Sequence, residues 1–468
     1  MLLATVAVML GAMHRIPLHV PEDENEGWNA YYSLTAMSGG LLYPQSNSFL
    51  TNNYPPLSFL LVGLLGKALG DYIVAGRVIA LASELLVALN VYWLVRLFRG
   101  GYFVSLFAAG LFLLYVGANI TYGVAMDDPE WLGHAFTTSA AVVYLRATDR
   151  RHPIASVLIA SLLSVAGVFV KHSVIVLPAV ILLWSVWYAR GRLVLWTTAS
   201  LALGIGALAM TVHAYGLVFL QDLLEHKRVF SSGKAVHDAS LLLAPLAPLL
   251  VYAGVLALLS WRERGVQFVL LYAAVAATFG MFCLSGAGVD ANILFDLIIA
   301  LCVSAGLLAA RTARFCAPEY QDLAPALVAV AITTACLPAS LRALERSRLW
   351  IQEDHRELEH YQNLIALIAA APGPVACEQP SLCYWAAKPF ELDFFNYGQK
   401  ILTGTVDPTS LRERIDRQEF AYVQTVGSPG EINSNTTRLL GGELSRRIKA
   451  RYAVVHQVGE DFLLAPRR

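Results

Sequence analysis

Long apolar runs separated by short clusters of arginine dominate this sequence. Of its 468 residues, 57% are hydrophobic and 15% are charged, whereas a soluble domain carries about 25% charged residues. Runs of about 20 apolar residues are what an α-helix needs to cross the hydrocarbon core of a bilayer. The sequence therefore predicts an α-helical, polytopic membrane protein. Its formal net charge of zero gives no indication of nucleic-acid binding.

The arginine clusters predict the topology, because cytoplasmic loops of membrane proteins are enriched in Lys and Arg. Five clusters are placed in the cytoplasm: Arg96 and Arg99; Arg146, Arg150 and Arg151; Arg190 and Arg192; Arg262 and Arg264; Arg311 and Arg314. About eleven transmembrane helices and a cytoplasmic N-terminus follow. The predicted spans are 1–14, 78–95, 102–120, 131–146, 153–170, 174–189, 193–217, 240–259, 266–284, 293–309 and 323–341. The short apolar run 57–69 is predicted to be a re-entrant or membrane-skimming helix on the outside.

The composition changes at about Arg342, where charged residues become frequent and long apolar runs cease. We therefore predict a transmembrane domain of residues 1–341 and a small soluble α/β domain of residues 342–468, which the topology places in the periplasm. Helical periodicity and strand-like alternation in the second part support this division. The helical segments are 358–370 and 410–417, and the strand-like segments are 374–377, 420–426 and 452–464.

Two of the six cysteines, Cys377 and Cys383, lie in the predicted soluble domain. An outside location would allow them to form a disulfide. Their close spacing alone does not establish the bond.

The most polar stretch, residues 21–56, lies in the first predicted outside loop, residues 15–77. It opens with five consecutive acids or amides: Glu22, Asp23, Glu24, Asn25 and Glu26. Acidic residues concentrated at a membrane edge indicate chemistry or ion binding, although a solvated loop would have the same composition. The stretch ends in Asn53 and Tyr54 before two prolines, which fix an extended chain ahead of the next apolar helix.

A second acidic motif, MDDPEW at residues 126–131, is predicted on the same outer face. It contains Asp127 and Asp128 followed by Pro129. Proline in the first turn of a helix and acids beside its N-terminus also make an ordinary helix cap. The charge topology nevertheless brings the two acidic motifs to one side of the membrane.

These segments resemble the GT-C superfamily of membrane glycosyltransferases. The likeness is to the branch that holds protein O-mannosyltransferases and lipid A aminoarabinose transferases. It rests on NEGWNAYYSLTAMSGGLLYP at 25–44, NNYPPLSFLLVGLLGKALGDYIVAGR at 52–77 and the Asp-Pro motif. It covers about the first 190 residues well and the remaining spans loosely.

The resemblance implies an enzyme of the bacterial inner membrane. Its donor would be a polyprenyl-phosphate sugar, and its acceptor a hydroxyl of a cell-envelope lipid, glycan or protein at the outer face. Transfer would proceed with inversion. Membrane lipids are the other expected partners.

The resemblance also implies site residues. The family's first-loop Asp-Glu pair falls on Asn25 and Glu26, so an amide stands where one acid is usual. Either Asp23 or Glu26 would then be the base that takes the acceptor proton, in a site that also includes Glu24. The second-loop acid matches Asp128, with Asp127 as its neighbour. The basic residue often found before the two prolines is absent, since Asn53 and Tyr54 stand there.

The donor phosphate must then be held by another cation on the outer face. Lys171, with His172 beside it, ends an apolar run at the membrane surface. It could equally be a lysine that snorkels from a helix end. Arg228 lies in the cluster His226-Lys227-Arg228, which could instead be solvated or bind lipid headgroups.

Two further expectations concern a metal and a buried acid. Asp23, Glu26 and Asp128 could jointly hold Mg²⁺ or Mn²⁺, ions that prefer carboxylate ligands, although some enzymes of the superfamily use no metal. Asp296 lies one turn into an apolar helix, where an unpaired acid is costly, so it is predicted to face the donor cavity. The Gly-rich segment before it would otherwise be a turn with Asn292 as a helix cap.

The alternative function is a transporter or lipid flippase, in which the acidic loops would be ligands for a substrate or an ion. Transporters commonly show interrupted helices in two matching halves of the chain. Here the acids are concentrated in the first third, and a soluble domain is appended. The pattern therefore favours the enzyme.

Overall fold

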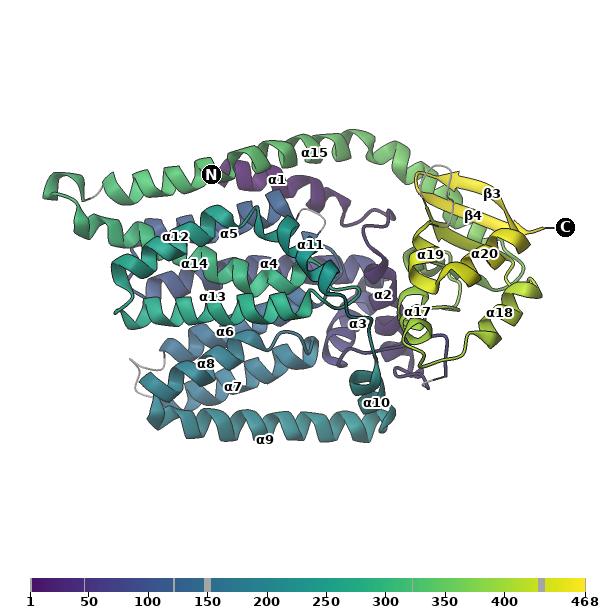
Figure 1. The fold of residues 1–468 in the computed structure, drawn as a ribbon, viewed down its shortest axis with the longest axis horizontal. Helices are drawn as coiled ribbons and strands as arrows, with labels where there is room; N and C mark the ends of the chain where they lie inside the picture. The colour runs from purple at the N-terminus through teal and green to yellow at the C-terminus, as the bar shows by residue number, and fades with distance from the viewer. Residues whose placement is uncertain are drawn as a thin grey trace.

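The computed structural model describes residues 2–45, 47–120, 123–146, 153–321, 323–427 and 434–467. A long helical bundle meets a small α/β domain at one end (Figure 1). The helices of the bundle are α1 (Leu2–Arg15), α2 (Glu24–Ser38), α3 (Leu57–Leu69), α4 (Tyr72–Leu97), α5 (Tyr102–Asn119), α6 (Glu130–Arg146), α7 (Pro153–Val170), α8 (Val176–Tyr188), α9 (Arg190–Tyr215), α10 (Val218–Glu225), α11 (Ser232–Leu243), α12 (Ala247–Ser260), α13 (Arg264–Cys283), α14 (Phe295–Thr312) and α15 (Leu323–Ala369). Short 3-10 turns at Ala291–Leu294, Ala313–Phe315 and Pro318–Tyr320 flank α14.

Each predicted span coincides with a helix, except that 240–259 coincides with the pair α11 and α12, which is bent by 78° at a short break. Among the described residues, 6 helices are long and apolar enough to cross a membrane, or 7 when the bent pair counts as one span. The remaining predicted spans correspond to shorter helices. The predicted polytopic helical fold is confirmed, and the apolar run 57–69 forms the separate helix α3.

Helix α14 is the centre of the bundle. Nearly all of its side chains are buried, as expected for a helix that is apolar on every side. Gly306 allows close packing, because a Cβ there would lie 2.8 Å from Cβ of Ala108 on α5. Small residues at such crossings are typical of helix packing in membranes.

Three arginine-rich turns meet at the end of the bundle opposite to the α/β domain. Arg311 donates to Oε2 of Glu263 from Nη2 at 2.7 Å and to the carbonyl of Phe98 at 2.7 Å. Arg314 donates to Oε1 of the same Glu263 at 2.5 Å. The clusters that the charge rule assigns to one side therefore lie together, whereas Arg150 and Arg151 lie outside the described residues.

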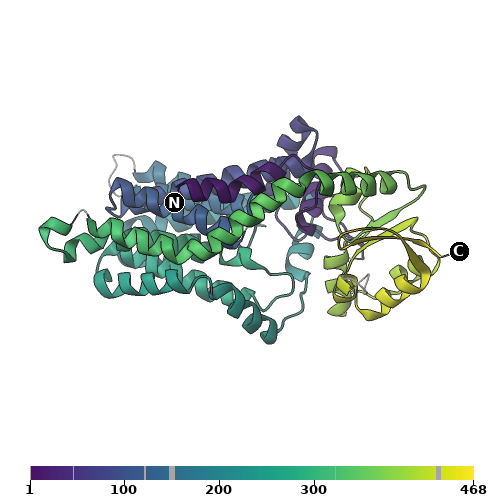
Figure 2. The same ribbon diagram turned by 90° about the horizontal axis from the view of Figure 1, so that it is seen from above.

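Helix α15 joins the two parts of the molecule. It is 47 residues long and runs from the bundle into the α/β domain (Figures 1 and 2). The predicted boundary at 341/342 falls inside this helix, and the predicted elements 323–341 and 358–370 are two stretches of it. Beyond the boundary the helix still packs on α1, where Ser347 lies against Gly11, and it then continues to the α/β domain (Figure 2).

The C-terminal domain contains a four-stranded sheet in the order β1-β2-β4-β3. Strand β1 pairs parallel with β2, and β4 pairs antiparallel with both β2 and β3. The predicted strand region 452–464 is a hairpin. The elements are β1 (Val375–Cys377), α16 (Pro380–Trp385), α17 (Phe394–Leu402), α18 (Thr409–Asp416), β2 (Tyr422–Val426), α19 (Ser434–Leu440), α20 (Gly442–Arg451), β3 (Tyr452–Val458) and β4 (Asp461–Pro466).

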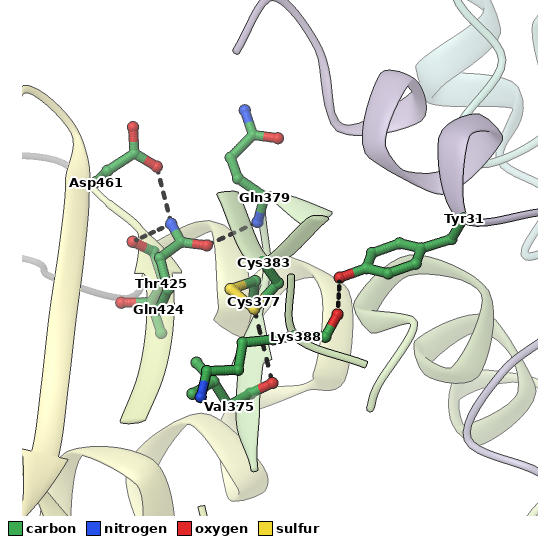
Figure 3. Close-up of a disulfide and its surroundings, with 9 residues drawn as sticks. All are labelled: Tyr31, Val375, Cys377, Gln379, Cys383, Lys388, Gln424, Thr425 and Asp461. Atoms are coloured by element: carbon green, nitrogen blue, oxygen red, sulfur yellow. Dashed lines mark hydrogen bonds between the residues drawn. A yellow bond between two sulfur atoms is a disulfide. The ribbon is translucent and has the colours of Figure 1, made fainter. Parts of the chain in front are cut away.

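The predicted disulfide between Cys377 and Cys383 is present, with the two Cα atoms 6.0 Å apart. It ties the end of β1 to α16 (Figure 3). Nearby, the side-chain oxygen of Gln424 accepts from the backbone N–H of Gln379 at 2.7 Å. These contacts fix the segment that follows β1.

The C-terminal domain packs directly on α2. Indole Nε1 of Trp28 donates to Oδ2 of Asp393 at 2.9 Å, and the Tyr31 hydroxyl donates to the carbonyl of Lys388 at 2.7 Å (Figure 3). At Gly27 an added Cβ would lie 2.0 Å from the backbone nitrogen of Ser381. Only glycine permits this approach of α16 to α2.

Candidate active site

A cavity of ≈ 680 Å³ lies where the bundle meets the C-terminal domain. Every predicted outside segment contributes to its lining, although these segments are far apart in the sequence. The predicted site residues that line it are Asp23, Glu24, Asn25, Asn53, Tyr54, Asp128, Lys171, His172 and Arg228. The structure thus brings most of the predicted site together.

The acidic run begins a helix and is not a loop throughout. Asp23 is the N-cap of α2, and its Oδ1 accepts from the backbone N–H of Asn25 at 2.8 Å. The first turn contains Glu24 and Glu26, and acids there interact favourably with the helix dipole. The predicted outside segment therefore contains a helix, with Asp23 as its cap and Glu24 and Glu26 in its first turn.

Burial in the cavity raises the pKa values of the two acids at this helix start. The pKa of Asp23 rises to about 6, mainly through loss of solvation, although two hydrogen bonds from Asn25 oppose the rise. The pKa of Glu24 rises to about 8 through the same cause, and the nearby charges of Asp23 and Glu378 add to it. Asp23 is therefore a carboxylate that can accept a proton near neutral pH.

Glu26 does not line the cavity. Its two oxygens accept from Nε and Nη2 of Arg77, each at 2.7 Å, and both side chains are almost completely buried. Arg77 also donates to the carbonyls of Arg15, Leu18 and Val20. The predicted placement of Glu26 in the site is corrected accordingly. Both of its carboxylate oxygens bind the Arg77 guanidinium, so Glu26 has a structural role.

The second acidic motif meets the first through Glu26. The backbone N–H of Asp127 donates to Oε1 of Glu26 at 3.3 Å, and Asn29 donates to the carbonyl of Asp127 at 2.7 Å. The Asp127 side chain itself is buried against Gly76, outside the cavity lining, and burial raises its pKa well above the usual range. The predicted substrate contact of Asp127 is therefore also corrected.

Asp128 lines the cavity and accepts hydrogen bonds from three groups. Its Oδ1 accepts from Nζ of Lys171 at 2.9 Å and from the backbone N–H of Glu130 at 2.8 Å. Its Oδ2 accepts from Nδ2 of Asn292 at 2.9 Å. The acid thus fixes three segments to one another.

Lys171 is held by two carboxylates and an aromatic ring. In addition to Asp128, Oε2 of Glu130 lies 2.7 Å from its Nζ, and the Nζ stands 5.1 Å from the ring centroid of Tyr54. Burial alone would lower the pKa of Lys171, but the two carboxylates outweigh it and raise the pKa well above the usual range. Lys171 is therefore a fixed cation facing the cavity.

Two further cations of the cavity lining come from the segment between α10 and α11. Arg228 donates to the carbonyl of Ala287 at 3.2 Å and stands 5.5 Å from the ring centroid of Phe395. Lys227 also lines the cavity. Burial, with Lys171 and Arg228, lowers the pKa of His172 to about 4, so His172 is neutral at pH 7.

Asp296 was predicted to face the cavity, but it does not line it. It is buried on α14, where its Oδ1 accepts from the hydroxyl of Tyr272 at 2.5 Å and lies 3.6 Å from Nδ1 of His134. The predicted donor contact is corrected, because these two side chains from the bundle surround the acid.

Several lining residues were not predicted from sequence. The sequence marks Glu130 only as part of an acidic motif and Asn292 only as a possible helix cap, and Glu378 and Asp393 come from the C-terminal domain. Asn435 and Thr436 donate to the carboxylate of Glu378. No local pattern marked Glu378 or Asp393, because only the packing of the domain on α2 brings them to the cavity.

The predicted set of metal ligands does not fit an ion. Glu26 is bound by Arg77, and Asp128 is bound by Lys171 and Asn292. Within the described part of the chain, no three His, Cys, Asp or Glu side chains come close enough together to hold a metal. No step is therefore assigned to Mg²⁺ or Mn²⁺ at these residues.

No protein family and no curated protein matches the sequence. Solved structures do match. ArnT from Cupriavidus metallidurans in the apo state has a TM-score of 0.63 at 15% identity, covering 98% of this chain and 96% of that one. The same ArnT bound to undecaprenyl phosphate gives 0.61 at 14% identity, with the same coverage.

An oligosaccharyltransferase from Archaeoglobus fulgidus, solved with a tethered acceptor peptide, has a TM-score of 0.56 at 11% identity and covers 99% of this chain and 74% of that one. A further structure of that enzyme, which covers 99% of this chain at a TM-score of 0.55, contains zinc and sulfate. The chain therefore shares the fold of these solved structures over nearly its whole length, which is the fold class that the sequence predicted.

Proposed function

We propose that the chain is a glycosyltransferase that moves a sugar from a polyprenyl-phosphate donor to a hydroxyl acceptor. The observation that carries the proposal is the cavity, whose lining includes the acids Asp23 and Glu24 and the cations Lys171 and Arg228. Such a cavity can hold a phosphate beside cations and a hydroxyl beside a base. The acceptor is a lipid, glycan or protein of the cell envelope.

Lys171 and Arg228 are the proposed ligands of the donor phosphate. A leaving phosphate gains negative charge as its bond to the sugar breaks, and fixed cations stabilise that charge. Lys171 is preorganised for this role, because Asp128 and Glu130 already hold its ammonium group at 2.9 and 2.7 Å. Asp128 is thus proposed to act by positioning Lys171.

Asp23 is the proposed general base. It lines the cavity, its pKa is raised to about 6, and within the described part of the chain its Oδ2 has no donor. Its carboxylate takes the proton of the acceptor hydroxyl, the hydroxyl oxygen bonds to the anomeric carbon, and polyprenyl phosphate leaves with the electrons of the broken bond. Attack opposite to the leaving phosphate inverts the anomeric centre.

The proposed location is the bacterial inner membrane, with the N-terminus in the cytoplasm and the C-terminal domain in the periplasm. The meeting of the arginine-rich turns at the end opposite to the cavity supports this orientation. The cavity would then open at the outer face, where the lipid-linked donor and envelope acceptors meet.

A direct assay tests the proposal. Purified wild-type chain is incubated with radiolabelled polyprenyl-phosphate sugars and a panel of envelope lipids, glycans and peptides, with Asp23→Asn as the matched inactive control. Transfer by the wild type and none by the variant supports the proposal. Movement of labelled lipid across proteoliposomes without any transfer would instead identify the transporter or flippase.

A further inference from the structure

His134 lies directly behind the cavity wall, one helical turn after Glu130 on α6. Its side chain is 1% exposed. The rings of Trp131 and Phe295 stand 6.2 and 6.0 Å from its own ring, and these two rings stack on each other at 3.8 Å. The imidazole is therefore enclosed at a fixed place between α6 and α14.

The two nitrogens of His134 face two different carboxylates. Nε2 lies 3.6 Å from Oε1 of Glu130, and Nδ1 lies 3.6 Å from Oδ1 of Asp296. Within the described part of the chain, neither nitrogen has a partner at hydrogen-bond distance. Hydrogen bonds at active sites are often long without substrate and shorten in the complex.

A series of polar groups runs through this histidine to the cavity, and its two links to His134 are slightly longer than a hydrogen bond. Its links are Tyr272 to Asp296 at 2.5 Å, Asp296 to His134 and His134 to Glu130 at 3.6 Å each, and Glu130 to Lys171 at 2.7 Å. It passes through α13, α14 and α6 and ends at the loop that carries Lys171. Only its last member, with Glu130, lines the cavity.

Glu130 depends mainly on Lys171 for a hydrogen-bond donor, since its other donor is the Ser173 hydroxyl at 3.4 Å. Lys171 also binds Asp128, so two buried carboxylates share its ammonium group. Carboxylates that are buried without enough partners are costly. A donor phosphate would compete for the same ammonium group, so Glu130 needs another partner whenever Lys171 binds phosphate.

We infer that His134 is a positioning residue for the donor-phosphate site, acting through Glu130 on Lys171. When Lys171 donates a hydrogen bond to the phosphate, His134 donates to Glu130 in its place. Asp296, which is itself bound by Tyr272, holds the imidazole in position. The inference rests on the proposed function, in that Lys171 binds the phosphate of a polyprenyl donor.

A double-mutant cycle on binding tests the inference. Affinity for undecaprenyl phosphate is measured for wild type, His134→Gln, Lys171→Met and the double variant. We expect His134→Gln to weaken binding by about tenfold, within the range for residues coupled through one ion-pair network. In the Lys171→Met background the same change should have no further effect. Equal losses in both backgrounds would overturn the inference.

Tyr144→Phe is the matched control, since Tyr144 is also buried on α6 and donates or accepts at 2.6 Å with Ser185. It should leave undecaprenyl phosphate binding unchanged. Asp296→Asn, nearly identical in shape to the native residue, gives the same test if His134→Gln fails to fold. If His134→Gln binds undecaprenyl phosphate as well as the control does, the inference about His134 is overturned and the proposed function is not affected. If the wild type binds no undecaprenyl phosphate, both the inference and the proposed function are overturned.

Discussion

Arg77 binds Glu26 through two parallel hydrogen bonds of 2.7 Å, and the same guanidinium donates to four backbone carbonyls, at the last residue of α1 and in the segment between α1 and α2. Arg77 thereby fixes the segment that leads into Asp23. The acid that the resemblance suggested as a base is in this structure the counterion of a buried arginine. Asp23, three residues earlier, is the acid that lines the cavity.

Glu26→Gln should therefore destabilise the protein, because it leaves the buried Arg77 without its counterion. Removing one partner of a buried ion pair costs about 3–5 kcal/mol. The melting temperature in detergent measures this, with Glu413→Gln, at an exposed ion pair, as the control. A Glu26→Gln variant that melts like wild type and loses only kcat would identify Glu26 as the base.

Asp23→Asn should instead lower kcat and leave undecaprenyl phosphate binding intact. Removing a general base typically costs about 100- to 10,000-fold in rate. Since the base must be unprotonated and burial raises its pKa to about 6, wild-type kcat/KM should rise with pH through about 6 and then level off. An unchanged rate in Asp23→Asn, or a rate that falls over this interval, would contradict the assignment.

Glu24 should make stability depend on pH in a definite direction. The pKa of a solvated glutamate is 4.5, and that of Glu24 in the folded protein is about 8, because of burial first and neighbouring acids second. Its contribution to stability is fully present below pH 4.5 and is lost as the pH rises through 8. Glu24→Gln, which mimics the protonated acid, should match wild type in melting temperature at pH 4 and exceed it at pH 8.5. The reverse order would show that the acid is ionised and paired.

The sequence was sufficient for the parts of this structure that have a local signal. Apolar runs predict the helices of the bundle, and the charge rule collects the outside segments that form the cavity. The sequence could not show that Glu26 pairs with Arg77, 51 residues away, because that pairing depends on how α2 and α4 pack. For the same reason Asp393 carries no signal, since it reaches the cavity only through the contact of its domain with Trp28.

The orientation of the chain is a separate prediction. An odd number of crossings from a cytoplasmic N-terminus places the C-terminal domain outside, as the arginine clusters require. Alkaline phosphatase fused after residue 468 should be active in a bacterial host. Fluorescence from a reporter that matures only in the cytoplasm, fused at the same point, would refute the topology.

The disulfide should matter for activity through Glu378, which directly follows Cys377 and lines the cavity. The two cysteines are separated by 6 positions in the sequence, and a disulfide that closes so short a loop contributes about 2 kcal/mol to the free energy of unfolding. The variant with Cys377→Ser and Cys383→Ser should melt at a lower temperature and show a raised KM for the acceptor, because the segment that packs on Gly27 is released. Cys283→Ser is the control, since Cys283 also lines the cavity but is not disulfide-bonded. An unchanged KM in the double variant would assign the disulfide to stability alone, and free thiols at both positions in protein from its native membrane would remove the basis of the prediction.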